Sequence, residues 1–287
     1  MQQTNIQFSK SRQVDDVVSD SIDFLKQNFK PLLRTYFTIC GLFVVASMVM
    51  GIVHYFQMRA HIGDVGSMFS IAYLIYVFFS MMSITALFVT TLSYLAVYRD
   101  KQNQTPTVEE VWGYFKYYFL KSFGVLLIIF IISCIGLIFC AIPGIYLFTV
   151  LSLMLPIIIL ENTTIGYAFD RCFQIIKNSF WTVFGSMFVM SIILTAAYIA
   201  ALIPVMLFVQ LFAMISGSSF QTLYYLPMLV LSHAIQFLYV LPIIALAFNY
   251  FSLTEQREGT SLRERIEAFG TVKEQKDDNS ISSSEEY

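Results

Sequence analysis

The chain has 287 residues, of which 57% are hydrophobic and 13% are charged, with a formal net charge of −2. Its mean hydropathy of +0.69 is too high for a soluble domain, and its length is too great for a single membrane anchor. The apolar runs are long and unbroken, which predicts membrane-spanning helices rather than strands. We therefore expect an all-α, polytopic membrane protein, and the charge gives no argument for a nucleic-acid partner.

Six apolar runs predict six transmembrane helices, at residues 35–57, 69–97, 120–140, 144–160, 182–213 and 224–252. Lys and Arg gather before the first, third and fifth runs and after the sixth. In the connections that follow the first, third and fifth runs, the only such residue is Arg59. Because Lys and Arg stay on the cytoplasmic side, both termini are expected to be cytoplasmic.

At the start of the chain, residues 1–13 are expected to form a disordered leader ahead of a six-helix membrane domain, 14–253. An amphipathic helix from Val14 to Phe29 is predicted to end at Pro31, where the first span begins.

Small residues and prolines in the spans predict close helix contacts, a turn and a kink. Ser47 and Gly51 lie one turn apart in the first span, which predicts the close approach of a neighbouring helix. Pro143 and Gly144 predict a tight turn that makes the third and fourth helices antiparallel neighbours. In the fifth run, Pro204 predicts a kink.

After the sixth span, residues 254–270 are predicted to form a cytoplasmic amphipathic helix, with Ser261 and Glu264 as its capping box. Residues 271–287 have the composition of a disordered tail.

Three segments that precede the odd-numbered spans share one pattern of apolar residues with a Lys. The matching residues are Val18, Ile22, Leu25, Lys26 and Phe29; Val108, Trp112, Phe115, Lys116 and Phe119; and Phe169, Phe173, Ile176, Lys177 and Phe180. The pattern predicts an internal repeat of three units, each a cytoplasmic-surface amphipathic helix followed by a transmembrane hairpin. The alternative is three solvated helix faces that select no particular lipid.

The candidate lipid- or partner-contact residues are Lys26, Lys116, Lys177, Glu161, Asp170 and Arg171. Lysines on such faces can reach anionic headgroups while the phenylalanines anchor below them. The densest charged set near a membrane edge runs from Glu161 to Lys177, and a charge-balanced helix surface explains it equally well.

His233 and Gln236 lie one turn apart in the sixth span and form a candidate intramembrane polar spot. A hydrogen-bonded packing histidine is the simpler interpretation. His54 and His61 lack further ligands, so no metal site is predicted. The sequence contains no motif of a catalytic site and no phosphate-binding glycine loop, so we expect no cofactor and no enzyme activity.

The run PGIYLFTVLSLMLPIIILENTTIGYAFDRCFQIIKNSFWTVFG carries a set of spaced residues, namely Pro143, Gly144, Tyr146, Pro156, Glu161, Ala168, Arg171, Trp181 and Gly185. With the later segment YFSLTEQREGTSLRERIE, it resembles the bacterial membrane-domain family named after glycerophosphoryl diester phosphodiesterases. The phosphodiesterase activity of some relatives lies in a separate soluble domain that has no counterpart in this sequence. The resemblance therefore implies a membrane module of the bacterial inner membrane without catalytic activity.

The leading hypothesis is a non-catalytic membrane protein that senses the bilayer or docks a partner in envelope homeostasis. Its expected partners are membrane lipids and either a membrane protein or a second copy of the chain. The alternative is a transporter or channel for an amphiphilic small molecule or lipid, prompted by Pro204, Pro227, Pro242 and the polar spot. A lipid-modifying enzyme would need polar side chains converging from several helices. A polar, accessible cavity between the helices would separate these hypotheses.

Overall fold

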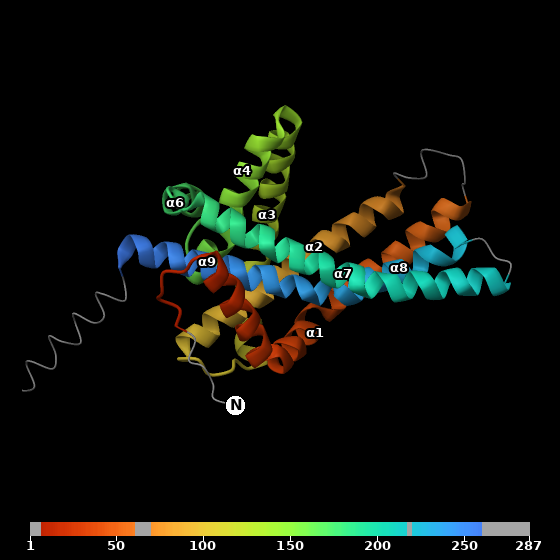
Figure 1. Ribbon diagram of the computed structural model, residues 1–287, viewed down its shortest axis with the longest axis horizontal. Helices are drawn as coiled ribbons and strands as arrows, with labels where there is room; N and C mark the ends of the chain where they lie inside the picture. The colour runs from red at the N-terminus through yellow and green to blue at the C-terminus, as the bar shows by residue number, and fades with distance from the viewer. Residues whose placement is uncertain (1–6, 61–69, 217–219, 260–287) are drawn as a thin grey trace, which may run out of the picture.

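The computed structural model describes residues 7–60, 70–216 and 220–259 (Figure 1). Its helices are α1 (Val14–Ala60), α2 (Ile71–Asp100), α3 (Val108–Phe139), α4 (Ala141–Ser152), α5 (Met154–Leu160), α6 (Ile165–Ile176), α7 (Phe180–Ser216), α8 (Phe220–Ile235), the 3-10 helix η2 (Gln236–Tyr239) and α9 (Val240–Glu258). No strand occurs in these ranges. The all-α prediction is confirmed.

Six helical stretches are long and apolar enough to cross a membrane, as predicted for a multi-pass membrane protein. Two of them are composite, because α4 and α5 together make one stretch and α8, η2 and α9 make another. Each predicted apolar run overlaps one of these stretches.

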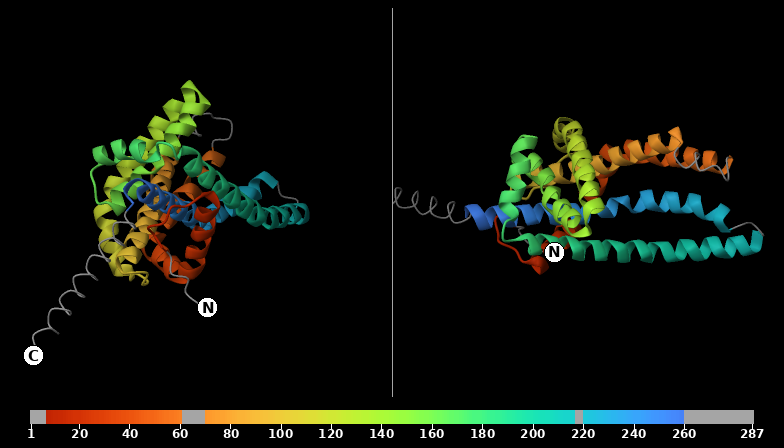
Figure 2. Two further views of the ribbon diagram at one scale, coloured as in Figure 1. Left: turned by 60° about the vertical axis from the view of Figure 1, so that its left-hand side comes forward. Right: turned by 90° about the horizontal axis from the view of Figure 1, so that it is seen from above.

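The molecule is elongated, and most of its helices follow the long axis (Figure 1). The helices α7, α8 and α9 extend along this axis, whereas α3 and α4 rise across it, and the view from above agrees (Figure 2). The helices that could cross a membrane are therefore not all parallel to one another.

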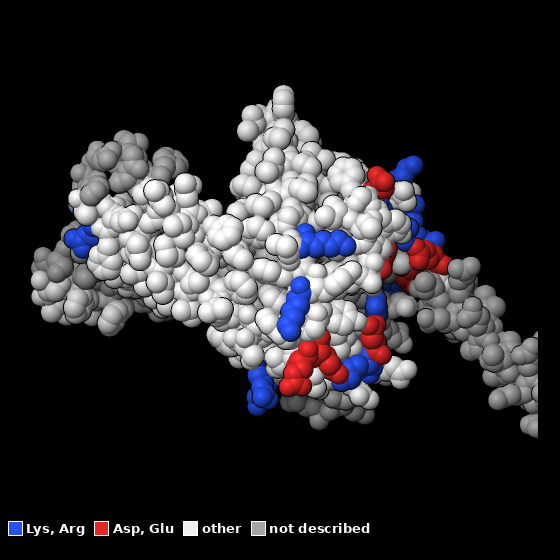
Figure 3. All heavy atoms as spheres, turned by 180° about the vertical axis from the view of Figure 1, so that it is seen from behind, with Lys and Arg blue, Asp and Glu red and all other residues white. Residues whose placement is uncertain are grey.

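Charged side chains gather at one end of the molecule, and most of the remaining surface is uncharged (Figure 3). This charged end contains α6, the start of α7 and the end of α9 (Figure 1). After Arg34, the only charged residue of α1 is Arg59, near the end of the helix. Segments rich in Lys and Arg that are far apart in the sequence thus lie together at one end of the structure.

The densest core lies where α2, α5 and α9 meet near the charged end. All seven residues of α5 are buried, as are Ile243 to Leu253 of α9 and Leu92 to Tyr98 of α2. In contrast, α7 buries few of its apolar side chains, namely Val183, Met190, Val209 and Ala213, and many others are exposed. Lipid can cover such side chains in a membrane protein, so they need no protein partner.

The first amphipathic segment does not end at Pro31. Instead, α1 continues through this proline to Ala60, and Figure 1 shows the helix changing direction along its length. Pro31 removes one backbone hydrogen bond, which a long helix tolerates by bending. The segment before the third span is likewise continuous with it in α3, so of the three repeated segments only that of α6 forms a helix separate from the following span.

In the first of the repeated segments, the stripe that the protein buries lies one residue before the predicted apolar stripe. Val17, Ser21, Phe24 and Asn28 are buried, whereas Phe29 is 43% exposed. Val111 and Tyr118 of α3, and Ala168, Cys172 and Ile175 of α6, are buried at the equivalent offset. Most residues of the predicted apolar stripes therefore lie at the edge of the protein core, although Phe115 and Ile176 are buried inside it.

The turn between α3 and α4 comes three residues earlier than predicted. Cys140 has extended backbone angles and is the single residue between the two helices, so Pro143 and Gly144 belong to the first turn of α4. A Cβ atom on Gly136 would lie 2.9 Å from the Cα of Gly144. This close approach lets the two helices pack backbone to backbone.

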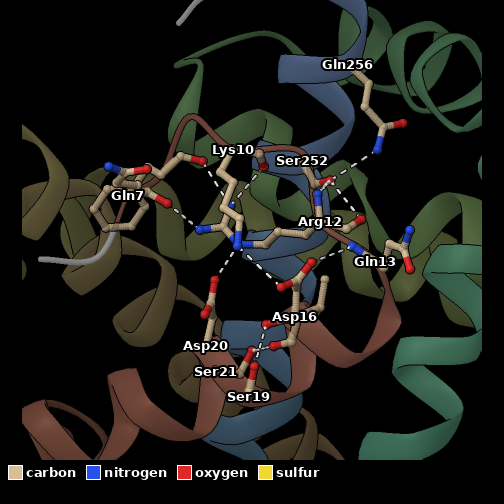
Figure 4. A network of polar contacts seen from close by, with 12 residues as sticks. Gln7, Lys10, Arg12, Gln13, Asp16, Ser19, Asp20, Ser21, Ser252 and Gln256 are labelled. Carbon is tan, nitrogen blue, oxygen red and sulfur yellow. Dashed lines mark hydrogen bonds and ion pairs between the residues drawn. The ribbon is translucent and has the colours of Figure 1, made fainter. Parts of the chain in front are cut away.

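Residues 7–13 were expected to be disordered, but they pack against α9 (Figure 4). The backbone N–H of Arg12 donates to Ser252 at 2.8 Å, and its Nε donates to Asp20 at 2.8 Å. Phe8 packs against the rings of Tyr98 and Phe251. The composition of the segment indicated disorder, but its ordering comes from partners that are distant in the sequence.

The predicted helix at 254–270 begins inside α9, which ends at Glu258 with Gly259 in the left-handed conformation. Its Ser261 and Glu264, and the tail 271–287, lie outside the described residues, as do residues 1–6.

Candidate functional site

A cavity of about 450 Å³ lies between the spanning helices. Its wall combines side chains from α1, α2, α4, α7 and the run from α8 through η2 to α9. The polar lining residues are Ser47, Tyr76, Ser80, Ser83, Ser191, Ser232, His233, Gln236 and Tyr239. No Lys, Arg, Asp or Glu occurs among the described residues that line it.

Ser47 indicates the depth of this cavity. It lies 13 residues after Arg34 and 12 residues before Arg59, the nearest charged residues of α1 on either side. At 1.5 Å per residue, these separations are about 20 Å and about 18 Å along the helix. Because the hydrocarbon core is about 30 Å thick, Ser47 would lie near mid-membrane with both charges at the membrane surfaces.

One wall of the cavity is a broken helix. The 3-10 turn η2 interrupts the predicted sixth span between α8 and α9. Pro242, in the first turn of α9, has no N–H to donate to the carbonyl of Leu238, and its ring would clash with that carbonyl in a regular α-helix. The proline therefore accounts for the break at this position.

The break also explains which side chains reach the cavity. His233, Gln236, Tyr239 and Pro242 all line it, at a spacing of three residues. In a continuous α-helix, nine residues turn through about 900°, so the first and last of these would face opposite sides. A 3-10 turn has about three residues per turn, which helps to bring the four onto one wall.

Both ring nitrogens of His233 have partners within the protein. Nδ1 lies 2.8 Å from the backbone oxygen of Leu229, and Nε2 lies 2.9 Å from the hydroxyl of Ser47. Because a carbonyl only accepts hydrogen bonds, Nδ1 donates to Leu229, whereas the single hydroxyl proton of Ser47 is shared between Nε2 and the backbone oxygen of Val44, which lies 2.9 Å from Ser47 Oγ. His233 thus links α8 to α1 as a packing histidine does.

Gln236 is paired with a serine that the sequence did not single out. Its Nε2 donates to Ser83 Oγ at 2.9 Å, and this hydroxyl donates to Gln236 Oε1 at 3.2 Å. The pair joins η2 to α2. Because the amide has a second N–H proton, Gln236 retains one donor beyond this pair.

Ser80 differs from the other serines of the cavity. Ser191 and Ser232 donate to carbonyls of their own helices, those of Met187 and Leu229, both at 2.8 Å. The Oγ atom of Ser80 is shielded from solvent and has no hydrogen-bond partner among the described residues. Buried hydroxyls without a partner are rare in proteins, and rotation about χ1 would turn this one toward the cavity that Ser80 lines.

The predicted charged set near α6 forms a link within the protein, away from the cavity. Arg171 contacts Glu161 at 3.8 Å and also pairs with Glu258 at the end of α9. Tyr250 donates to Glu161 at 2.9 Å. This network ties the surface helix α6 to α9. Asp170 is exposed and makes no ion pair among the described residues.

The three repeated lysines have different surroundings. Lys26 forms an exposed pair with Asp23 at 3.5 Å, and Nζ of Lys116 lies 5.3 Å from the ring centre of Trp112. Lys177 is exposed, and its carbonyl accepts a hydrogen bond from Arg257 at 3.1 Å. None of the three lines the cavity.

Among the described residues, no group of three or more His, Cys, Asp or Glu could hold a metal. His54 lies against the ring of Tyr73 and 3.4 Å from the hydroxyl of Ser70. His61, its predicted neighbour, lies outside the described residues.

The polar residues of α2 that line the cavity were not predicted from the sequence. Tyr76, Ser80 and Ser83 recur at helical spacing within the second span, so they share one face of α2. This polar stripe in an apolar run was a detectable signal. The choice of partners across the cavity, however, depends on packing between helices that lie far apart in the sequence.

No protein-family model, no curated protein and no solved structure matches this chain.

Proposed function

We propose that this chain is a non-catalytic integral membrane protein that binds an amphiphilic small molecule or lipid in the cavity between its spans. The observation that carries this proposal is the cavity itself, with polar side chains from several helices at mid-span. Its volume of about 450 Å³ lies in the range of ligand sites, roughly 300–1,000 Å³. Polar groups at such depth in a membrane are costly and are commonly functional.

We further propose a location in a bacterial inner membrane, with both termini and the charged end on the cytoplasmic side. The concentration of Lys and Arg at that end supports this orientation. The resemblance to the glycerophosphodiesterase membrane-domain family stays a prediction.

Transport of the bound amphiphile is the role that the broken helix favours. Discontinuous spanning helices next to mid-membrane sites are a feature of many carriers, and η2 lies in the cavity wall. By contrast, Pro204 does not interrupt α7, which continues from Phe180 to Ser216.

A cavity-filling substitution tests the proposal. Ser191→Phe would fill part of the cavity without removing a hydrogen bond between helices, because Ser191 bonds only within α7. Thr195→Phe, one turn later and outside the lining, is the matched control. Native mass spectrometry of the delipidated protein, resupplied with membrane lipid extract, should show one retained amphiphile for the wild type and the control. Ser191→Phe should lose it, and equal retention by all three proteins would overturn the proposal.

A second candidate function, sensing of the bilayer by the surface segments, is favoured by their exposed aromatic residues. Phe29, Trp112 and Phe169 are 43%, 40% and 39% exposed and belong to the three predicted apolar stripes. Each segment also carries one of the lysines Lys26, Lys116 and Lys177. Such a face suits the headgroup region of a membrane.

The two tryptophans, Trp112 and Trp181, allow a direct test because both are exposed. In nanodiscs, their fluorescence should shift when phosphatidylglycerol replaces phosphatidylcholine, and Lys→Gln at all three lysines should suppress the shift. Lys10→Gln is the control, since this lysine lies outside the repeat. An unchanged response of the triple variant would remove this candidate.

A further inference from the structure

The cavity that we assign to an amphiphile has an unusual lining for a lipid site. Its polar groups are hydroxyls, one amide and one imidazole, and no charged side chain lies among the described lining residues. A charged group at mid-membrane is unfavourable unless an opposite charge pairs with it. The lining therefore offers neither an anionic nor a cationic head group its usual partner.

Most hydrogen-bonding groups of the cavity are already used by the protein. The imidazole of His233 is held by Leu229 and Ser47, and Gln236 is paired with Ser83. The groups left for a ligand are the hydroxyls of Tyr76, Ser80 and Tyr239, which make no hydrogen bond among the described residues, and the second amide proton of Gln236. A serine hydroxyl both donates and accepts, so it matches a ligand hydroxyl, which has the same two capacities.

The edges of the cavity point to entry from the bilayer. Ile84, Phe148 and Tyr239 line it and are 46%, 57% and 51% exposed on spanning segments. A volume of about 450 Å³ corresponds to about fifteen water molecules at ~30 Å³ each. This space suits a small head group with the first part of its chain, and the remaining chain would extend into the surrounding lipid.

We infer that the cavity takes the uncharged, hydroxyl-bearing head of a single long-chain lipid, of the alcohol or monoacylglycerol class, which enters sideways from the bilayer. This inference rests on the proposed function, and it adds the selection of the head group. Ser80 contacts the head. The hydrogen bonds of His233 to Ser47 and of Ser83 to Gln236 fix the positions of the helices around the site.

A competition series with one constant chain tests the selection. Full-length protein in detergent is loaded with a fluorescent long-chain alcohol, which is then displaced by oleyl alcohol, 1-monooleoylglycerol, oleate or oleylamine. The two uncharged competitors should act at concentrations at least tenfold lower than the two charged ones. Equal or stronger displacement by oleate or oleylamine would overturn the head-group inference while leaving the proposed function intact.

Failure of the proposed function itself gives a different result. In that case, the fluorescent alcohol would bind wild type, Ser191→Phe and Thr195→Phe equally, because it would be held only by the outer surface.

Ser80→Ala separates a ligand contact from a structural role. Since Ser80 makes no hydrogen bond among the described residues, the substitution should leave the Tm of the ligand-free protein unchanged and weaken oleyl alcohol binding about fivefold. Ser232→Ala is the control, because that hydroxyl is engaged within its own helix, and it should change binding less than twofold. A lowered Tm with unchanged alcohol binding in Ser80→Ala would overturn the assignment of Ser80.

Discussion

The guanidinium of Arg12 lies 4.8 Å from the ring centre of Phe248 and donates to Asp20 at 2.8 Å. It also donates to the backbone oxygens of Phe8 and Lys10, at 3.0 and 3.2 Å (Figure 4). Its side chain is 1% exposed, whereas that of Asp20 is 31% exposed. One buried charge thus holds the segment before α1 on the end of the bundle.

Replacing this arginine should destabilise the protein measurably. Arg12→Ala removes several charge-assisted hydrogen bonds, and because Asp20 can be rehydrated, we expect a loss of about 2 kcal/mol in the free energy of unfolding. Lys10→Ala, which removes a largely exposed pair with Asp16, should cost less than ~1 kcal/mol. Thermal unfolding in detergent compares the two, and equal Tm values would refute a stabilising role for Arg12.

For individual residues, the sequence indicated which polar side chains line the cavity better than it indicated which residues they contact. It drew attention to His233 and Gln236 because polar residues are rare in the spans, and both indeed line the cavity. It could not identify Arg12, whose contacts with Phe248 and Ser252 join the two ends of the chain. Such pairings are set by tertiary packing and leave no local pattern in the sequence.

At the scale of helices, the contact between α3 and α4 depends on two glycines. A Cβ atom would lie 2.9 Å from the backbone of Gly144 if placed on Gly136, and 2.7 Å from the backbone of Leu137 if placed on Gly144. Gly124, in the same helix α3, has nothing within 4 Å of its Cβ position. Gly124→Ala is therefore a matched control for Gly136→Ala.

Gly136→Ala should lower the Tm, because the backbones of α3 and α4 must separate to admit the methyl group. Gly124→Ala should leave it unchanged or raise it, since alanine favours a helix by up to ~1 kcal/mol over glycine. Differential scanning fluorimetry measures both variants. A destabilisation by Gly124→Ala as large as that by Gly136→Ala would show that the contact is not responsible.

The break between α8 and α9 should depend on Pro242. Pro242→Ala restores the missing N–H donor, so the helix can become continuous and rotate Gln236 or Tyr239 away from the cavity. We expect at least fivefold weaker binding of the fluorescent alcohol. Pro204→Ala, in α7 and outside the lining, should bind as wild type does, and unchanged binding by Pro242→Ala would contradict this role of the break.

Helices were predictable where long uncharged runs define them, and their ends were less so. Pro31 was expected to end a helix, yet α1 continues through it because surrounding contacts outweigh one lost hydrogen bond. The break at η2 was not located from the sequence, because Pro242, which accounts for it, lies three residues beyond the turn itself. The cavity arises only where five helical segments meet, and no single segment encodes it.

Over the whole molecule, charge separation and the direction of α3 and α4 determine how the protein can sit in a bilayer. If the long axis follows the membrane normal with the charged end at one surface, the hairpin of α3 and α4 lies across the normal (Figures 1 and 2). No charged residue occurs from Ser122 to Leu160, so this hairpin can remain in the hydrocarbon layer.

Cys140 at the tip of this hairpin reports its depth, because it is the one exposed cysteine in the described part of the chain. Burial raises the pKa of the Cys172 thiol to about 12, so that thiol stays protonated and unreactive near neutral pH. We expect a membrane-impermeant maleimide to leave Cys140 unmodified from either side, and a permeant maleimide to modify it more. Cys140→Ala identifies the site, and labelling only from the side opposite the charged end would show that the hairpin crosses the membrane.

The central claim, that a lipid-like ligand occupies the cavity between the spans, can be tested by photo-crosslinking. A diazirine-bearing analogue of 1-monooleoylglycerol, with the diazirine close to its head group, would be bound to the full-length protein, irradiated and located by peptide mass spectrometry. We predict crosslinks within Ser80 to Phe88 and within Ser232 to Tyr239, which line the cavity from α2 and from the broken helix, and their loss in Ser191→Phe. Crosslinks confined to the outer face of α7, around the exposed Leu207 and Phe208, and unchanged by Ser191→Phe, would contradict it.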